Sequence, residues 1–238
     1  MSGGTQGPKR SGALAAPDWA LLRRLPLFEG LEPEMLERLL AAARVESWPR
    51  GRQLFGQDEY ADHFYVILVG WVKLYRTTAD GHESVVHVFT RGESFAEAAI
   101  FAGARYPVSA AAADTSRLLA VPAEPFLRVL EAEPAVSRNM LAAMSRHLRQ
   151  LVNALEQLQA HSAPQRLATF LVSIAPAADG AADLRLPIDK ALIAARLGMK
   201  PETLSRALAR LRREGVEVRG DRIRVPEMAD LRRLSEGG

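Results

Sequence analysis

The sequence predicts an α+β fold in which an N-terminal β-roll, a long helix and a C-terminal winged helix-turn-helix follow one another. β-rich runs between glycines predict the first part, a strict spacing of Leu and Met predicts the second, and a glycine between two amphipathic segments predicts the third. We expect residues 1–20 to be a flexible leader, 21–132 the β-roll, 133–162 the long helix and 163–238 the helix-turn-helix domain.

The β-roll is predicted from the alternation of short β-rich runs with turn glycines between residue 48 and about residue 121. Residues 64–76 and 84–89 are the clearest of these runs, and short strands with regular turns are typical of a compact roll or barrel. Apolar residues at helical spacing in 33–43 precede this region, and Pro122 opens a helical stretch after it.

The long helix carries the clearest periodicity in the chain, a stripe of six large apolar residues that step by 3, 4, 3, 4 and 3. This alternation is that of a coiled-coil seam. Burial of the stripe against a partner helix gains about 1.5–3 kcal/mol of free energy per side chain. This gross gain, from which the cost of association has still to be subtracted, is ample for dimerisation. We therefore expect a homodimer, and packing of the stripe on the chain's own β-roll is the alternative. The seam consists of Leu141, Met144, Leu148, Leu151, Leu155 and Leu158.

Residues 188–215 carry the strongest functional signal, because two amphipathic helical segments flank a glycine. Asp189 can cap the first helix, and Ala195 is small enough for a second helix to cross closely. Gly198 ends the first helix because glycine adopts positive φ without steric cost, and Pro201 suits the first position of the next helix. The apolar positions that the two helices are expected to bury are Leu192, Ile193, Leu197, Leu204, Leu208 and Leu211.

The outer face of the second helix has the chemistry to read DNA. In a helix-turn-helix, the N-terminal residues of the second helix reach base edges in the major groove. Arg206 can pair bidentately with guanine, Glu202 can accept from a cytosine amino group, and Ser205 is a permissive contact. The other DNA-binding candidates are Lys200, Thr203, Arg210 and Arg212, of which the arginines are better placed for phosphates.

A wing follows the second helix. Residues 216–225 alternate apolar and polar side chains about Gly220 and Asp221, which predicts a β-hairpin. A plain helical hairpin with a basic solvated surface is the alternative. The cap, the turn glycine, the arginines and the hairpin favour the winged motif because they agree with one another.

The charge of the chain is unevenly distributed, although its net value is only +3. Residues 164–238 hold 14 Lys and Arg against 10 Asp and Glu, whereas the rest of the chain holds 17 against 18. A basic excess in the C-terminal third is expected of a surface that binds phosphate, but an ordinary solvated surface would carry it too.

The composition and the absence of certain motifs exclude several classes of protein. With 48% hydrophobic and 25% charged residues, the 238-residue chain has the composition of an ordinary globular protein. The absence of cysteine excludes disulfides and cysteine-ligated iron–sulfur clusters. No apolar run approaches the roughly 18 residues of a membrane span and no signal peptide is present, so we expect a cytoplasmic protein. We expect no enzyme, because G-x-S-x-G, P-loop and H-E-x-x-H motifs and a cysteine nucleophile are missing.

Nearly the whole chain resembles the CRP/FNR superfamily of bacterial transcription regulators. The segment LPLFEGLEPEMLERL (25–39), the β-roll, the long dimer helix and the winged helix-turn-helix follow in that family's order. The segment PETLSR (201–206) looks like the recognition helix of the FNR branch, in which Glu-x-x-Ser-Arg reads a TTGAT half-site of an inverted repeat. The resemblance gives Glu202, Ser205 and Arg206 these base-reading roles. It also implies a cyclic-nucleotide-binding-like β-roll, double-stranded DNA, a second copy of the chain and RNA polymerase as partners, and activation of transcription.

Cyclic AMP is disfavoured as the effector. The family's cyclic-nucleotide members hold ribose and phosphate with Gly-Glu-Leu-x-Leu and a later Arg-Ser/Thr-Ala. In the matching effector segment, residues 95–110, Ala96 replaces the glycine and Val108 replaces the arginine. Loss of the guanidinium removes the bidentate partner of the phosphate, and Arg105 stands three positions too early. The candidate residues of the effector pocket are Phe95, Ala96, Glu97, Tyr106, Val108 and Ser109.

The effector segment is also similar to the DNR-type branch of the family, which responds to nitric oxide through heme. The resemblance therefore implies a heme cofactor, which needs an axial ligand and an apolar slot. His63 and His147 are the candidate ligands, with ordinary surface histidines as the alternative interpretation; Glu97 and Tyr106 could equally be a buried hydrogen-bond partner and a packing residue. A cAMP-dependent or ligand-independent regulator of the same family and a DNA-architectural protein are the alternative functions.

Overall fold

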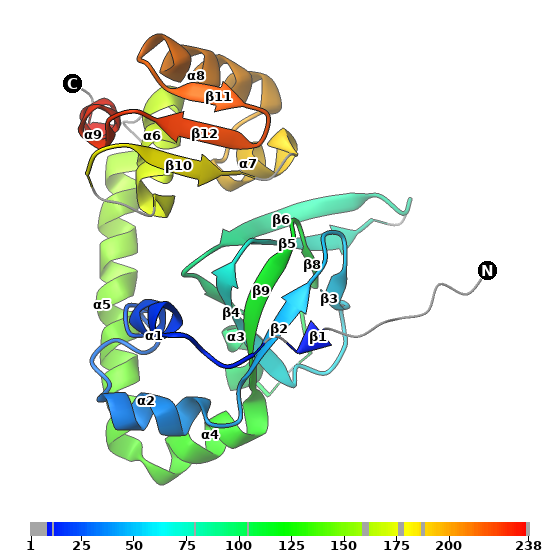
Figure 1. Ribbon diagram of the computed structural model, residues 1–238. Coiled ribbons are helices and arrows are strands. Elements are labelled where there is room, and N and C mark those ends of the chain that lie inside the picture. Colours follow the sequence, from blue (N-terminus) through cyan, green and yellow to red (C-terminus); the bar gives the residue numbers. More distant parts are fainter. Residues whose placement is uncertain are drawn as a thin grey trace. The chain divides into compact units, whose positions relative to one another are not determined.

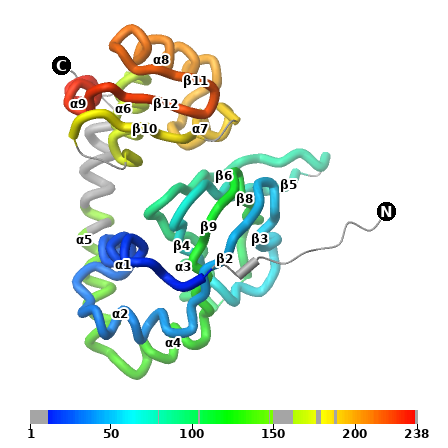
Figure 2. Tube along the Cα trace, viewed as in Figure 1, coloured from blue at the N-terminus to red at the C-terminus, as the bar shows by residue number. Residues whose placement is uncertain are grey.

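The computed structural model describes residues 9–10, 12–78, 80–103, 105–158, 162–175, 179–186 and 189–236 (Figure 1). Of His147, Gln150 and residues 151–158 only the backbone is described, so the side chains of three seam leucines, Leu151, Leu155 and Leu158, lie outside the description. The chain divides into two compact units, Met1–Ser84 with Phe89–Gln150 and Val85–Val88 with Leu151–Gly238. One boundary falls within the long helix α5 (Pro134–Leu158), which Figure 2 traces along the chain, and two fall within the strand β6 (Glu83–Thr90), whose middle residues group with the second unit.

The N-terminal unit contains the predicted β-roll. Its strands are β1 (Lys9–Arg10), β2 (Arg44–Trp48), β3 (Gln53–Phe55), β4 (His63–Val69), β5 (Trp71–Thr77), β6 (Glu83–Thr90), β7 (Ser94–Phe95), β8 (Ser109–Ala112) and β9 (Ser116–Pro122). They form one sheet of order β1-β2-β9-β4-β7 and a second of order β3-β8-β5-β6. Gly70 turns β4 into β5 with φ of 97°, and a Cβ there would lie 2.7 Å from the Ser116 Cα. Only glycine therefore fits this predicted turn.

Four short helices accompany the β-roll, and the first corrects the predicted leader. They are α1 (Ala16–Leu22), α2 (Pro33–Leu40), α3 (Glu97–Phe101) and α4 (Ala123–Ala132). The prediction of a flexible leader over residues 1–20 was wrong for its described part, because β1 pairs with β2, and α1 begins at Ala16 and buries Asp18. Asp18 of α1 forms an ion pair with Arg117 of β9. Burial raises the pKa of Asp18, but hydrogen bonds from the Arg117 guanidinium and the Ala15 N–H, together with the positive charges of Arg117 and Arg91, outweigh burial and lower it overall.

α5 carries two apolar stripes that face different ways. Val136 and Met140 are buried in the core of the N-terminal unit. Leu141, Met144 and Leu148 are 68%, 44% and 62% exposed. Since the β-roll core takes the first stripe, the described half of the seam does not pack on the chain's own β-roll, which removes that alternative for these three residues.

The C-terminal unit combines four helices with a small sheet. Its elements are α6 (Ala163–Ile174), β10 (Ala182–Arg185), α7 (Lys190–Arg196), α8 (Pro201–Arg213), β11 (Glu217–Arg219), β12 (Arg222–Val225) and α9 (Met228–Glu236). α6 packs against α8 and α9, and the sheet order is β10-β12-β11. β10 pairs with β12 from Ala182, opposite Val225, to Arg185, opposite Arg222. The last helix, α9, was not predicted from the sequence; it buries Met228 and Leu231.

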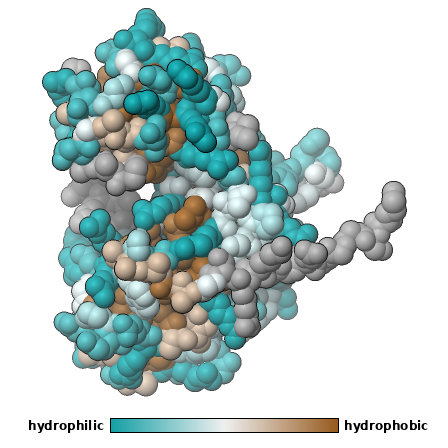
Figure 3. All heavy atoms as spheres, viewed as in Figure 1, coloured by the Kyte–Doolittle hydropathy of each residue, from teal (hydrophilic) through white to brown (hydrophobic). Residues whose placement is uncertain are grey.

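The face drawn in Figure 3 is mostly hydrophilic. Polar residues dominate it and apolar residues show only in patches. Among the helices that the structure describes, none is both long enough and apolar enough to span a membrane. The apolar side chains of the N-terminal unit are instead gathered in one core, to which β2, β4 and β9 contribute.

Candidate DNA interface and effector segment

The helix-turn-helix forms at the predicted residues. The Asp189 carboxylate accepts a 2.9 Å hydrogen bond from the Ala191 N–H and so caps α7. Gly198 has φ of 59° in the turn, and Pro201 is the first residue of α8. The cap, the turn glycine and the helix-starting proline are therefore confirmed.

The close approach of the two helices depends on a different alanine from the predicted one. Ala195 is exposed, whereas Ala194 is 1% exposed and packs in the core. Leu197, at the end of α7, is only half-buried. Each residue turns an α-helix by about 100°, so an error of one position moves the expected contact to another side of α7.

α8 separates a buried face from an exposed one. Glu202, Ser205 and Arg206 are all exposed in its first two turns. The Arg206 Nη2 lies 3.4 Å from the Thr203 Oγ1, a long hydrogen bond that occupies one of the five guanidinium donors. Lys200, Arg210 and Arg212 are exposed as well, and Thr203 is half-buried. The residues that fix the orientation of the helix by their burial are Leu204, Ala207, Leu208 and Leu211.

The wing adds basic residues that the sequence analysis did not single out. β11 and β12 pair across Gly220, whose φ is 62°. Asp221 in this turn accepts a 2.8 Å hydrogen bond from the Arg185 Nε, which lowers the pKa of Asp221. The polar positions of the alternation could have revealed the missed candidates for phosphate contact. These exposed arginines are Arg219, Arg222 and Arg224.

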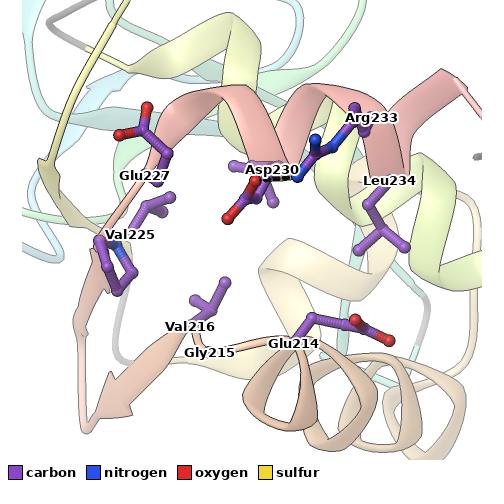
Figure 4. A pocket seen from close by; sticks show the side chains of 10 residues that line it. Glu214, Gly215, Val216, Val225, Glu227, Asp230, Arg233 and Leu234 are labelled. Carbon is purple, nitrogen blue, oxygen red and sulfur yellow. Dashed lines mark hydrogen bonds and ion pairs between the residues drawn. The ribbon is translucent and has the colours of Figure 1, made fainter.

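A pocket of about 350 Å³ lies between the end of α8, β12 and α9 (Figure 4). Its lining holds three carboxylates, those of Glu214, Glu227 and Asp230, and one arginine, Arg233. Figure 4 shows Arg233 joined to Asp230, and the two form an ion pair. A lining of this charge repels phosphate, so the pocket does not suit a contact with the DNA backbone.

The structure brings the two aromatic residues of the predicted effector pocket together. The rings of Phe95 and Tyr106 both lie beside Phe55, at centroid distances of 6.3 and 3.7 Å. Ala96 follows Phe95 with φ of 73° and ψ of 1°, a left-handed conformation that costs a non-glycine residue about 1–2 kcal/mol. Ala96 thus keeps a backbone conformation that suits the glycine of the family pattern.

The residues that match the family's phosphate-binding stretch are buried. Val108 and Ser109 are 7% and 8% exposed. The Ser109 Oγ accepts a 3.0 Å hydrogen bond from the Gln57 N–H. Arg105 donates from Nη1 to the Asp58 carbonyl at 2.6 Å, so its guanidinium is bound to the preceding loop.

Glu97 provides a pH-dependent prediction. Burial raises the pKa of Glu97, and a hydrogen bond with Ser94 opposes the rise. The folded state therefore favours the protonated carboxyl. The protonated Glu97 carboxyl thus contributes to the free energy of unfolding. This contribution is fully present below the pKa of about 4.3 that the group has in the unfolded chain, and it is lost as the pH rises through the pKa in the folded protein. We expect Glu97→Gln to have a higher free energy of unfolding than the wild type at pH 7, with the difference shrinking towards pH 4.

Urea denaturation at several pH values between 4 and 8 measures this difference. Glu37→Gln, at an exposed position of α2, is the matched control and should shift the free energy of unfolding little across the same range. A Glu97→Gln variant that is less stable than the wild type at pH 7 would show that the ionised carboxylate is favoured in the fold.

Of the two predicted heme-ligand candidates, His63 is the one whose side chain the structure describes. Its Nδ1 lies 3.0 Å from the Asp62 Oδ1, and metal-ligating histidines commonly carry such a carboxylate on the other ring nitrogen. It borders a cavity of about 690 Å³ to which Ile100 and Leu127 contribute apolar side chains. The side chain of the other candidate, His147, is not among those that the structure describes. Among the described residues, there is no group of three or more His, Asp and Glu side chains that could hold a metal ion.

Comparisons with known proteins agree with this architecture. A model of the cyclic nucleotide-binding domain matches residues 45–133, and one of the Crp-like helix-turn-helix domain matches residues 165–234. The cyclic AMP receptor protein of Thermus thermophilus is 31% identical over 89% of this chain and 97% of its own length.

Two solved structures extend the agreement to three dimensions. A protein from Ruegeria pomeroyi is 41% identical, with 93% of this chain and 98% of that chain covered and a TM-score of 0.86. DNR from Pseudomonas aeruginosa is 30% identical, with 94% and 100% covered and a TM-score of 0.58. Two further curated relatives, one from Mycobacterium tuberculosis and one from Stutzerimonas stutzeri, are transcription regulators rather than enzymes. The chain belongs to the CRP/FNR superfamily of transcription regulators that bind DNA through a helix-turn-helix.

Proposed function

We propose that the protein is a dimeric regulator whose α8 reads an FNR-like TTGAT half-site in an inverted repeat. The exposed face of the first two turns of α8 carries this proposal. It presents an acceptor, a hydroxyl and a guanidinium, from Glu202, Ser205 and Arg206, in the part of the helix that meets base edges.

Each of these side chains suits one contact. Arg206 can donate two parallel hydrogen bonds to the O6 and N7 of the guanine in TTGAT, and Glu202 can accept from a cytosine amino group of the opposite strand. Ser205 can bind a base or a phosphate. The side chains that would surround them at the DNA backbone, adding affinity that falls with salt, are Lys200, Thr203, Arg210 and Arg212.

The inverted repeat requires a dimer, because two recognition helices must enter the major groove about one helical turn apart. The exposed stripe of Leu141, Met144 and Leu148 supports dimerisation through α5, since its apolar surface has no place in the chain's own β-roll core. The bound dimer would recruit RNA polymerase and activate transcription.

The effector that we propose is heme rather than cyclic AMP, although the Thermus relative is named for the nucleotide. Buried Val108 replaces the arginine of the phosphate site, and Arg105 is bound to the Asp58 carbonyl. His63 would hold the heme, whose iron would supply a site for nitric oxide. A ligand changes activity only through a difference in affinity between two states of the protein, so heme would have to bind the DNA-competent state more tightly.

Fluorescence anisotropy on a TTGAT-N4-ATCAA duplex at fixed salt tests this proposal. The full-length protein is titrated alone, with cyclic AMP, and with ferrous heme plus nitric oxide. Tight binding only with heme and nitric oxide supports the effector, and activation by cyclic AMP contradicts it. Each mismatch in TTGAT should cost about 1–3 kcal/mol; a negligible cost would favour an architectural protein over a regulator.

A further inference from the structure

A second cavity of the N-terminal unit, of about 420 Å³, has aromatic walls. It opens beside β2, β3 and the start of β4, and five aromatic residues line it. These residues, which define the aromatic cavity, are Trp48, Phe55, Tyr60, Tyr65 and Tyr106. Its size lies within the roughly 300–1,000 Å³ of small-molecule sites.

The inner rings are held in place by their neighbours. Trp48 Nε1 donates a 3.1 Å hydrogen bond to the Glu46 Oε2. Phe55 stacks on Tyr106 with ring centroids 3.7 Å apart, and the Tyr106 hydroxyl donates a 2.7 Å hydrogen bond to the His63 carbonyl. Tyr60, by contrast, is 67% exposed. The cavity therefore has a rigid floor and an open rim.

One polar group in this floor lacks a partner. Tyr65 is 6% exposed and lines the cavity. Its hydroxyl makes no hydrogen bond to any residue that the structure describes. The hydroxyl is not among the fully buried side-chain atoms that lack a partner, so it is open to the cavity, where a ligand with a hydroxyl of its own could bond to it.

The walls carry negative charge. Glu46, Glu59 and Asp62 line the cavity, and no Lys or Arg is among its described lining residues. The pKa of Tyr65 is raised first by burial, and then by Tyr106 and by these three carboxylates. All three carboxylates are therefore close enough to the Tyr65 hydroxyl at the floor of the cavity to disfavour a further negative charge there.

We propose that the aromatic cavity binds a small organic cation with an alkylated ammonium group and a hydroxyl. Aromatic rings attract such cations through the negative charge on their faces, and an alkylated ammonium group has little hydration to lose. Carboxylates around the rings add Coulomb attraction, while a phosphate would be repelled. Choline has this chemistry. The proposal goes beyond DNA recognition and needs no heme, although His63 borders both cavities.

Isothermal titration of the full-length protein, without added heme, compares choline with 3,3-dimethylbutan-1-ol, which has the same shape without the charge. We expect saturable binding of choline, one per chain, and binding of the neutral analogue at least about tenfold weaker. Equal binding of the two compounds, or no binding of choline, overturns the proposal.

Three variants locate the binding. Glu59→Gln and Tyr60→Ala change exposed positions, so both should fold, and each should weaken choline binding at least about threefold. Tyr65→Phe removes only the hydroxyl and should weaken choline more than tetramethylammonium. Glu37→Gln on α2 is the charge-matched control and should leave binding unchanged. Choline binding that survives both Glu59→Gln and Tyr60→Ala lies elsewhere and overturns the assignment.

Discussion

Replacing Leu141 and Leu148 together by Glu will leave the protein monomeric. Both side chains are more than 60% exposed in the single chain, so the monomer loses little stability. In the dimer each buried leucine contributes about 1.5–3 kcal/mol, and four glutamates would face one another across the seam. We expect the dimer dissociation constant to rise at least about 1,000-fold, and sedimentation at micromolar concentration should give one 26.0 kDa chain in place of two.

The same variant should bind the inverted repeat at least about 100-fold more weakly, because one protomer contacts one half-site. Ala142→Glu, at an exposed position of α5 outside both apolar stripes, adds a charge to the same helix and should change neither mass nor affinity. Circular dichroism would verify that both variants fold. If the double variant sediments like the wild type, dimerisation does not depend on this stripe.

Local rules predicted those parts of the fold that are set by neighbouring residues. The turn at Gly198 and the hairpin at Gly220 are short-range features, because a positive φ selects glycine. The periodicity of α5 likewise predicted a helix. The anchoring of α1 was missed because it depends on Arg117, about a hundred positions away along the chain. Such long-range pairs leave little trace in local patterns.

The two candidate sites also differ in how far they could be predicted from the sequence. The reading face of α8 could be predicted because helical spacing alone puts Glu202 and Arg206 opposite the buried leucines. The aromatic cavity could not, because Trp48, Tyr60 and Tyr106 come from three separate segments that only the tertiary fold brings together. Replacement of the phosphate arginine by Val108 was visible in sequence, but the burial of Val108 needed the structure.

Arg206→Ala should remove the preference for guanine in the half-site while leaving general DNA binding largely intact. A bidentate contact to guanine contributes about 1–3 kcal/mol of discrimination, and the dimer makes it twice. For the wild type we therefore expect TTGAT-N4-ATCAA to bind about 30-fold or more tightly than TTAAT-N4-ATTAA. For Arg206→Ala this ratio should fall close to one, as measured by anisotropy at constant salt.

Arg210→Ala is the contrasting variant, because Arg210 is exposed on the same helix but suits a phosphate contact. It should weaken both duplexes equally and keep the ratio between them, and the slope of log affinity against log salt should become shallower by about one per protomer. Arg206→Lys retains the charge without the planar fork and should fall between wild type and alanine in discrimination. A ratio that is unchanged in Arg206→Ala would mean that another side chain reads the guanine. An equal decrease in affinity for both duplexes would make Arg206 a phosphate contact, because electrostatic attraction does not depend on sequence.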